Sequence, residues 1–223
     1  MNDLRNSLQR GAKQLELSLS DEQTDRLLAY LALLVKWNNA YNLTAVRHPQ
    51  DMISRHLLDS LSVMRFLTGQ RFVDVGTGAG LPGVVLAIMQ ADNHFTLIDS
   101  NGKKTRFLTQ VKAELALTNV DIQQARVEKI DAYRCFDGVL SRAFSNLQDL
   151  VDKSAHLLTP DGYFYAMKGV YPQEELSTLP KAYNVKACHP LSVPGEPGDR
   201  HLVVIANRRV ADEENFPRGN HVG

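Results

Sequence analysis

One short segment combines an acidic residue with closely spaced glycines, a pattern that can hold a small ligand. It reads Asp-Val-Gly-Thr-Gly-Ala-Gly-Leu-Pro-Gly and runs from Asp74 to Gly83. It ends a run with strand composition, Arg71 to Val75, and an apolar helical pattern follows. Glycines remove side chains where the backbone must turn tightly and approach a ligand closely. A loop of this kind between a strand and a helix binds ligands at the carboxyl edge of a parallel sheet.

The charge beside this loop favours one ligand over another. Gly78, Gly80 and Gly83 form a literal G-x-G-x-x-G, the pattern of dinucleotide-binding loops. Asp74, however, would repel a pyrophosphate and attract a cation, such as the amino group of S-adenosylmethionine (SAM). Asp99, at the end of the next predicted strand, could accept hydrogen bonds from the ribose hydroxyls of either ligand. We therefore predict SAM, with a dinucleotide and a ligand-free structural turn as the alternatives.

The residues after the fourth predicted strand indicate the class of methyl acceptor. The sequence there, Leu140 to Phe144, lacks the Asn/Asp-Pro-Pro-Tyr/Phe run of many amino-methylating enzymes, and neither Cys135 nor Cys188 has the context of a cytosine-methylating nucleophile. Arg142 suits a guanine and its phosphate, because guanine N7 has a free lone pair and needs no base to remove a proton. The alternative is a structural ion pair between Arg142 and a carboxylate such as Glu128.

The elements that must position these residues alternate between strands and helices. A helical stripe runs from Phe107 to Leu115, a capping box at Ser145–Gln148 opens a helix to Leu158, and residues 160–162 form a turn. The last two strands are joined by a Pro/Gly-rich loop without a helix. We predict a Rossmann-like α/β fold with a mostly parallel seven-stranded sheet and a C-terminal antiparallel hairpin. Its strands are expected at residues 71–75, 94–99, 120–124, 136–140, 163–167, 184–189 and 201–206.

The first third of the chain has the pattern of helices. Ser20 and Gln23 form a capping box before an apolar helical stripe, and Pro49 suits the first turn of a later helix, as Pro82 does after the glycine loop. Trp37 at helical spacing is expected in the core. We also expect a structural polar network that joins this region to the sheet, formed by Asn42, His56 and Asp59.

Composition excludes several classes of protein. The 223 residues are 43% hydrophobic and 22% charged, with 25 basic and 25 acidic side chains, which is typical of a globular chain rather than a strongly basic nucleic-acid binder. No apolar run reaches the length of a membrane span, and Met1 to Arg5 lack a secretory signal pattern. Two unpatterned cysteines indicate a reducing compartment, so we expect a cytoplasmic protein. The histidines show no metal-ligand spacing, and no metal is expected.

Several separate motifs resemble those of the RsmG (GidB) family, the bacterial 16S rRNA guanosine N7-methyltransferases. The resemblance runs from about Ser20 to Ala206, and the helical-arm and Ser-Arg-Ala motifs are far more specific than the glycine loop alone. The motifs are Trp37-Asn38, Asn42-Leu43-Thr44, Arg55-His56, Asp59-Ser60, the glycine loop, Asp99-Ser100, Lys103-Lys104, Arg126-Val127-Glu128, Ser141-Arg142-Ala143, Lys168-Gly169 and Arg200-His201-Leu202-Val203-Val204.

This resemblance implies a class I SAM-dependent methyltransferase that modifies guanine N7 of 16S rRNA near the decoding centre. We expect folded rRNA within a small-subunit particle as the substrate, a monomeric enzyme, and no membrane partner. Rival functions are methylation of a small molecule or protein, nucleotide sensing without catalysis, and ribosome assembly without methyl transfer. The SAM contacts are expected at Asp74, Gly76, Gly78, Gly80, Leu81, Asp99, Val127, Glu128 and Arg142.

Two groups of cations remain to be assigned. Lys168 ends the fifth predicted strand, and we assign it, with Arg142, to the target nucleotide. Lys103, Lys104 and Arg106 begin a helix, where they could contact phosphates or form a solvated face. We expect a helical extension over residues 1–68, a SAM-binding methyltransferase domain over 69–207, and a flexible tail over 208–223.

Overall fold

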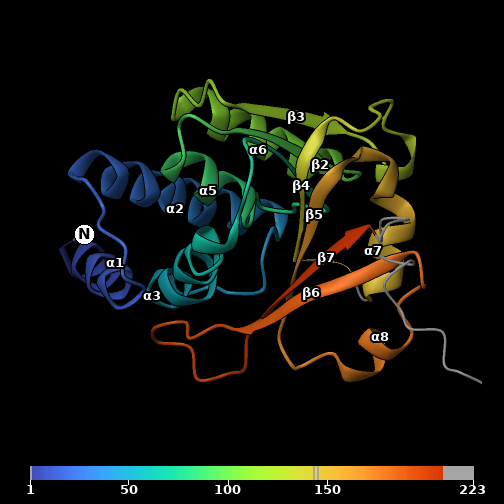
Figure 1. The fold of residues 1–223 in the computed structure, drawn as a ribbon. Coiled ribbons are helices and arrows are strands. Elements are labelled where there is room, and N and C mark those ends of the chain that lie inside the picture. Colours follow the sequence, from blue (N-terminus) through green and yellow to red (C-terminus); the bar gives the residue numbers. More distant parts are fainter. Residues whose placement is uncertain (1, 143, 145, 208–223) are drawn as a thin grey trace, which may run out of the picture.

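The structure is a computed structural model that describes residues 2–142, 144 and 146–207. The expected mobility of the tail over 208–223 therefore lies outside the described residues. N-terminal helices gather on one side of the molecule, and a twisted sheet forms its centre (Figure 1).

Seven strands form one sheet in the order β3-β2-β1-β4-β5-β7-β6. All neighbouring strands are parallel except that β7 runs antiparallel to both β5 and β6. This confirms the expected mostly parallel sheet with a C-terminal antiparallel hairpin. The strands are β1 (Arg71–Val75), β2 (His94–Asp99), β3 (Val120–Gln124), β4 (Phe136–Ser141), β5 (Leu158–Lys168), β6 (Tyr183–Pro190) and β7 (His201–Asn207).

The helices fall into an N-terminal arm and a set that connects the strands. The capping box is present at the start of α2, where the Ser20 hydroxyl accepts from the Gln23 amide and the Gln23 side chain accepts from Ser20. The arm contains α1 (Asn2–Gln14), α2 (Asp21–Tyr41), α3 (Pro49–Met52), the π-helical turn η1 (Ile53–Leu58), α4 (Asp59–Leu61) and the 3-10 turn η2 (Met64–Phe66). The connecting elements are α5 (Gly83–Met89), α6 (Gly102–Glu114), η3 (Val127–Lys129), α7 (Leu147–Ser154), η4 (Ala155–Leu157) and α8 (Gln173–Ser177).

Apolar side chains cover both faces of the sheet. Along β1, Phe72 faces the arm, α5 and α6, whereas Val73 and Val75 face α7. Burial on both faces is expected for parallel strands, because helices cover each side. The arm shares its apolar cluster with α5 and α6, and Trp37 packs there against Phe107, at 5.8 Å between ring centroids. The arm is thus part of the same core as the sheet.

Four local expectations differ from the structure. Residues 160–162 do not form a turn before a strand but lie inside β5, where the register with β4 shifts. The helix expected to reach Leu158 ends at Ser154, because a 3-10 turn and β5 follow. Its cap is Asn146, whose side chain accepts from the Asp149 amide, while Ser145 lies outside the described residues. Pro82 is the cap residue before α5, one position earlier than the first helical turn.

Candidate active site

Two cavities lie at the carboxyl edge of the parallel strands. The strand order reverses between β1 and β4, because β1 leads to β2 on one side and β4 leads to β5 on the other. Such a switch point opens a crevice where α/β proteins bind ligands. One cavity includes Phe144 in its lining and the other includes Arg142, so the segment after β4 borders both.

The first cavity has a volume of about 360 Å³ and collects four of the expected cofactor residues. Gly76 comes from the end of β1, Asp99 from the end of β2, and Val127 and Glu128 from η3. The structure therefore brings these four residues together from three separate segments. The remaining lining residues are Ile98, Ser100, Lys104, Ala125, Arg126, Phe144 and Lys153.

The glycine loop needs its glycines for two different reasons. Gly76, Gly78 and Gly80 have φ angles of 68°, 61° and 92°, in the region that side chains disfavour. A Cβ atom at Gly80 would also lie 2.4 Å from Val84 Cγ2, whereas one at Gly78 would meet nothing closer than 3.9 Å. Gly80 thus allows the loop to pack on α5, while Gly78 keeps open the space beside the Lys104 ammonium.

Asp74 holds the glycine loop to the start of α5. Its Oδ2 accepts from Thr77 Oγ1 at 2.7 Å and from the Gly83 amide at 2.9 Å, while its Oδ1 is buried with no hydrogen-bond partner among the described residues. Burial raises the pKa of Asp74 to about 6, although the bonds from Thr77 and Gly83 oppose the shift. The carboxylate lies beneath the loop rather than in the lining of the first cavity.

The arm also fixes the glycine loop. The buried Tyr30 hydroxyl of α2 donates to the Ala79 carbonyl at 2.7 Å, and burial raises the pKa of Tyr30 well above its usual value. Asp99 supports the same loop from the sheet, since its Oδ2 accepts from the Gly78 amide at 2.9 Å. The loop is therefore held in shape by hydrogen bonds from the arm and from β2. Leu81, also expected at the cofactor, is buried outside the cavity lining.

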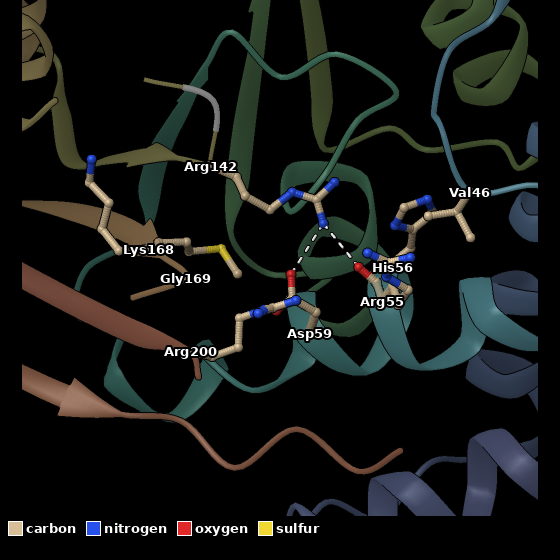
Figure 2. Close-up of a pocket in the computed structure, with 9 residues that line it drawn as sticks. Val46, Arg55, His56, Asp59, Arg142, Lys168, Gly169 and Arg200 are labelled. Carbon is tan, nitrogen blue, oxygen red and sulfur yellow. Dashed lines mark hydrogen bonds and ion pairs between the residues drawn. The ribbon is translucent and has the colours of Figure 1, made fainter. Parts of the chain in front are cut away.

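The second cavity, of about 340 Å³, contains the cations expected at the target nucleotide. Arg142 enters from the end of β4 and Lys168 from the end of β5 (Figure 2). Arg55 and Asp59 of the arm lie across from them. The other lining residues are Val46, His56, Met167, Gly169 and Arg200.

Asp59 is the centre of an ion-pair network across this cavity. Its Oδ2 accepts from Arg142 Nη1 at 3.1 Å, and its Oδ1 lies 3.3 Å from Arg200 Nε. Arg142 Nη1 also donates to the Arg55 carbonyl at 3.2 Å (Figure 2). Glu196 extends the network, with ion pairs to Arg55 at 3.2 Å and Arg200 at 3.6 Å. Arg142 does form an ion pair, but its described partner is Asp59 of the arm rather than Glu128.

Lys168 is directed away from Arg142 (Figure 2). Its ammonium pairs with Glu175 Oε2 of α8 at 2.7 Å and donates to the Phe144 carbonyl at 3.4 Å, and the side chain is 12% exposed. The lysine therefore ties β5 to α8 and to the segment after β4. Lys104 lies 3.5 Å from Asp99 Oδ2, so it belongs to the first cavity.

The polar network expected in the arm is divided into two parts. Asp59 joins the arm to the sheet, as expected, whereas Asn42 accepts from Arg47 at the arm surface. His56 Nε2 lies 2.9 Å from Thr44 Oγ1, and burial lowers the pKa of His56 to about 4, which leaves it neutral. The buried Asn38 side chain accepts from the Thr44 amide. Asn38, rather than Asn42, therefore belongs to the buried polar network of the arm.

Sequence reasoning assigned no site role to Arg200, although its position contained a signal. Because β7 is antiparallel, its first residue, His201, pairs with Lys168 at the end of β5. The residue before an antiparallel strand thus lies at the same edge as the residues after parallel strands. Because Arg200 directly precedes β7, this rule would have placed its guanidinium at the site.

The strand order, the glycine loop and the two cavities define a class I SAM-dependent methyltransferase fold. Solved structures share it, including a SAM-dependent methyltransferase from Aquifex aeolicus, with a TM-score of 0.55 at 16% identity over 67% of this chain and 90% of that one. The M. jannaschii TYW2 structure in complex with AdoMet has a TM-score of 0.52 at 18% identity, over 70% and 78% of the two chains. At these identities the similarity concerns the fold alone.

The chain belongs to the GidB family, described as rRNA small subunit methyltransferase G, whose family model matches residues 23–203. A "Ribosomal RNA small subunit methyltransferase G" of Stutzerimonas stutzeri is 56% identical over 89% of this chain and 93% of its own length. A protein of the same name from Idiomarina loihiensis is 52% identical over 87% and 95%. These matches confirm the family that the sequence motifs resembled.

Two features are absent from residues 2–142, 144 and 146–207. No helix in this part of the chain is both long and apolar enough to cross a membrane. Within the same ranges, no group of three or more His, Cys, Asp or Glu side chains is arranged to hold a metal ion.

Proposed function

We propose that this chain transfers a methyl group from SAM to guanine N7 of 16S rRNA, near the decoding centre. The observation that supports it most directly is the pair of cavities that meet at the end of β4, in a chain 56% identical to a named small-subunit rRNA methyltransferase. One cavity has the groups that suit SAM, and the other has cations that suit a nucleotide.

The first cavity fits the chemistry of SAM. We assign Asp99 to the ribose hydroxyls and Val127 and Glu128 to the adenine, because all three line this cavity and offer a carboxylate, an apolar surface and a second carboxylate. Gly76 lets the backbone approach the ligand without a side chain. Gly78, Gly80, Leu81 and Asp74 shape the loop beside it. When bound, SAM supplies an activated methyl group on a sulfonium.

The second cavity suits a guanine that attacks through N7. The N7 lone pair needs no base, because no proton leaves that nitrogen when the bond to carbon forms. The protein must therefore align the ring, and alignment can contribute roughly 7–11 kcal/mol to the lowering of the barrier. We assign Arg142 to the base or its phosphate beside the methyl donor, and Lys168 to the target nucleotide after its pair with Glu175 opens.

The charges around this cavity are largely compensated within the protein. Asp59 and Glu196 already pair with Arg142, Arg200 and Arg55, and the formal net charge of the chain is zero. RNA phosphates must compete with these carboxylates, so affinity for unstructured RNA is expected to be modest. This supports a folded substrate, which we take to be rRNA in a small-subunit particle.

The proposal includes a monomeric, cytoplasmic enzyme with a helical extension over residues 1–68 and a methyltransferase domain over 69–207.

Labelled SAM and small-subunit particles from cells that lack this gene test the proposal. Label should enter the 16S rRNA of these particles at a guanosine that becomes cleavable after borohydride and aniline treatment. Particles from normal cells are the control, because their site is already methylated. Equal labelling of a short unstructured guanosine oligomer would contradict the proposed substrate. Absence of label in both particles, with SAM still raising the melting temperature, would retain the cofactor and exclude this acceptor.

A further inference from the structure

The loop after β5 exposes two large apolar side chains directly after Gly169, a lining residue of the second cavity. Gly169 lines the cavity, and Val170 and Tyr171 follow it directly with 76% and 48% of their surfaces exposed. The only other large hydrophobic side chain exposed among the described residues is Tyr133, just before β4 and thus at the amino edge of the sheet. An exposed apolar patch beside a functional cavity indicates contact with a ligand or partner.

The Tyr171 ring is held in place although it is exposed. It packs edge-on against His201, with 5.5 Å between the ring centroids and 77° between their planes. His201 Nδ1 in turn lies 3.0 Å from the Gly169 carbonyl, so the same loop anchors the supporting ring. A held aromatic ring loses little conformational entropy when a flat group packs on it.

The surroundings favour a nucleobase over an apolar protein segment. The lining of the adjacent cavity includes Arg55, Arg142 and Arg200, which can attract the phosphates of an RNA strand. Unstacked bases in RNA loops pack on aromatic side chains while cations contact the backbone. Because Tyr171 follows the lining residue Gly169 by two positions and does not itself line the cavity, it would contact a base beside the target and not the target itself.

We propose that Val170 and Tyr171 form a stacking platform for the nucleobase next to the target guanosine in the RNA strand. This inference rests on the proposed function, because it assumes that the second cavity receives a nucleotide of the rRNA. The platform would hold the neighbouring base out of its own stack, so that the guanosine can enter the cavity.

Three substitutions at one position test the platform. Tyr171→Ala should raise KM for gene-deficient small-subunit particles about 5- to 100-fold, the range that one base–aromatic stack supports. The KM for SAM and the melting temperature should stay unchanged. Tyr171→Phe should retain the wild-type KM, because it keeps the ring, whereas Tyr171→Leu should behave like the alanine variant. Tyr133→Ala is the matched control and should match the wild type.

The outcomes separate the platform from the proposed function. Wild-type kinetics for Tyr171→Ala would overturn the platform. Equal rescue by leucine and phenylalanine would also overturn it, because a docked apolar protein segment would accept either side chain. Anisotropy with a labelled single-stranded RNA supplies a reading that does not depend on methyl transfer. If wild-type protein methylates no particle but Tyr171→Ala still weakens RNA binding, the proposed function fails, the platform beside a target guanosine fails with it, and only a contact between Tyr171 and RNA is retained.

Discussion

Asp59 of the arm accepts a hydrogen bond from Arg142 of the sheet at 3.1 Å, between residues that are 83 positions apart in the chain. The carboxylate is buried, and Arg200 approaches its other oxygen from the start of β7. Burial raises the pKa of Asp59, against the effect of both arginines. One carboxylate thus fixes two guanidinium groups and connects three parts of the fold at the edge of the second cavity.

Asp59→Asn should therefore reduce both stability and methyl transfer. Removing Asp59 leaves the partly buried Arg142 guanidinium without its counter-charge, while Arg200 keeps its pair with Glu196. The loss costs about 1–3 kcal/mol, because the Arg142 side chain keeps some exposure to water. Methyl transfer should fall at least tenfold, while SAM affinity changes much less, because Asp59 does not line the first cavity. Urea unfolding, calorimetry with SAM and the particle assay measure the three quantities.

The matched control is Asp121→Asn, which removes a carboxylate from exposed pairs with His94 and Lys112. Surface pairs contribute about 0–1 kcal/mol. Stability and activity of Asp59→Asn equal to those of this control would show that the buried pair has no special role.

Gly78→Ala and Gly80→Ala should fail in different ways. At Gly80 the new Cβ would lie 2.4 Å from Val84 Cγ2 and 2.8 Å from Leu108 Cδ2, so we expect a loss of about 2–4 kcal/mol in stability. At Gly78 there is room, and the left-handed backbone alone costs about 1–2 kcal/mol. That Cβ would instead narrow the space beside the first cavity, so SAM affinity should fall tenfold or more. Similar SAM affinity for Gly78→Ala and wild type would place the cofactor away from this loop.

Asp74 and His56 should give opposite pH dependences of stability. Burial raises the pKa of Asp74 to about 6 from 3.8. The folded chain therefore holds this proton more tightly than the unfolded chain, and the resulting contribution to stability is present at low pH and is lost as pH rises from about 4 to 6. Burial lowers the pKa of His56 to about 4 from 6.5. Between these two pH values His56 is protonated in the unfolded chain but neutral in the folded one, so the stability of the fold increases as pH rises from about 4 to 6.5. Each effect amounts to about 3 kcal/mol and offsets the other in the wild type.

Single substitutions should reveal each group separately. Relative to wild type, Asp74→Asn should gain stability as pH rises through this window, because only the His56 contribution remains. His56→Gln should lose stability over the same window. Urea unfolding at pH 4.5, 5.5 and 6.5 measures both slopes. Curves that stay parallel to wild type for both variants would show that neither group titrates as described.

Much of the fold was predictable because each strand carries its own local pattern. The capping box at Ser20, the glycine loop and the apolar runs of the sheet require no knowledge of distant residues. The turn expected at Pro160 to Gly162 was wrong because turn-forming residues can also be accommodated as an irregularity within a strand. Local composition does not distinguish these two outcomes.

The site was predictable only where position along a strand determines function. Strand ends placed Gly76, Asp99, Arg142 and Lys168 at one edge, and the structure has them there. The alternative of an ion pair at Arg142 named a carboxylate such as Glu128 and not Asp59, because the sequence contains no sign of how closely the arm approaches the sheet. That approach depends on the packing of α2 and α4 on α5, which is a tertiary effect.

Glu196→Gln should increase affinity for RNA and its dependence on salt. The carboxylate pairs with Arg55 and Arg200, and its removal frees Arg55 while Arg200 keeps Asp59. One additional phosphate contact should steepen the slope of log K against log salt concentration by about 0.7 for a single strand. Anisotropy titrations of an rRNA fragment at several salt concentrations measure this slope. Glu114→Gln, at the end of α6, changes the net charge equally and is the control; the same slope in both variants would assign the effect to net charge rather than to the released arginine.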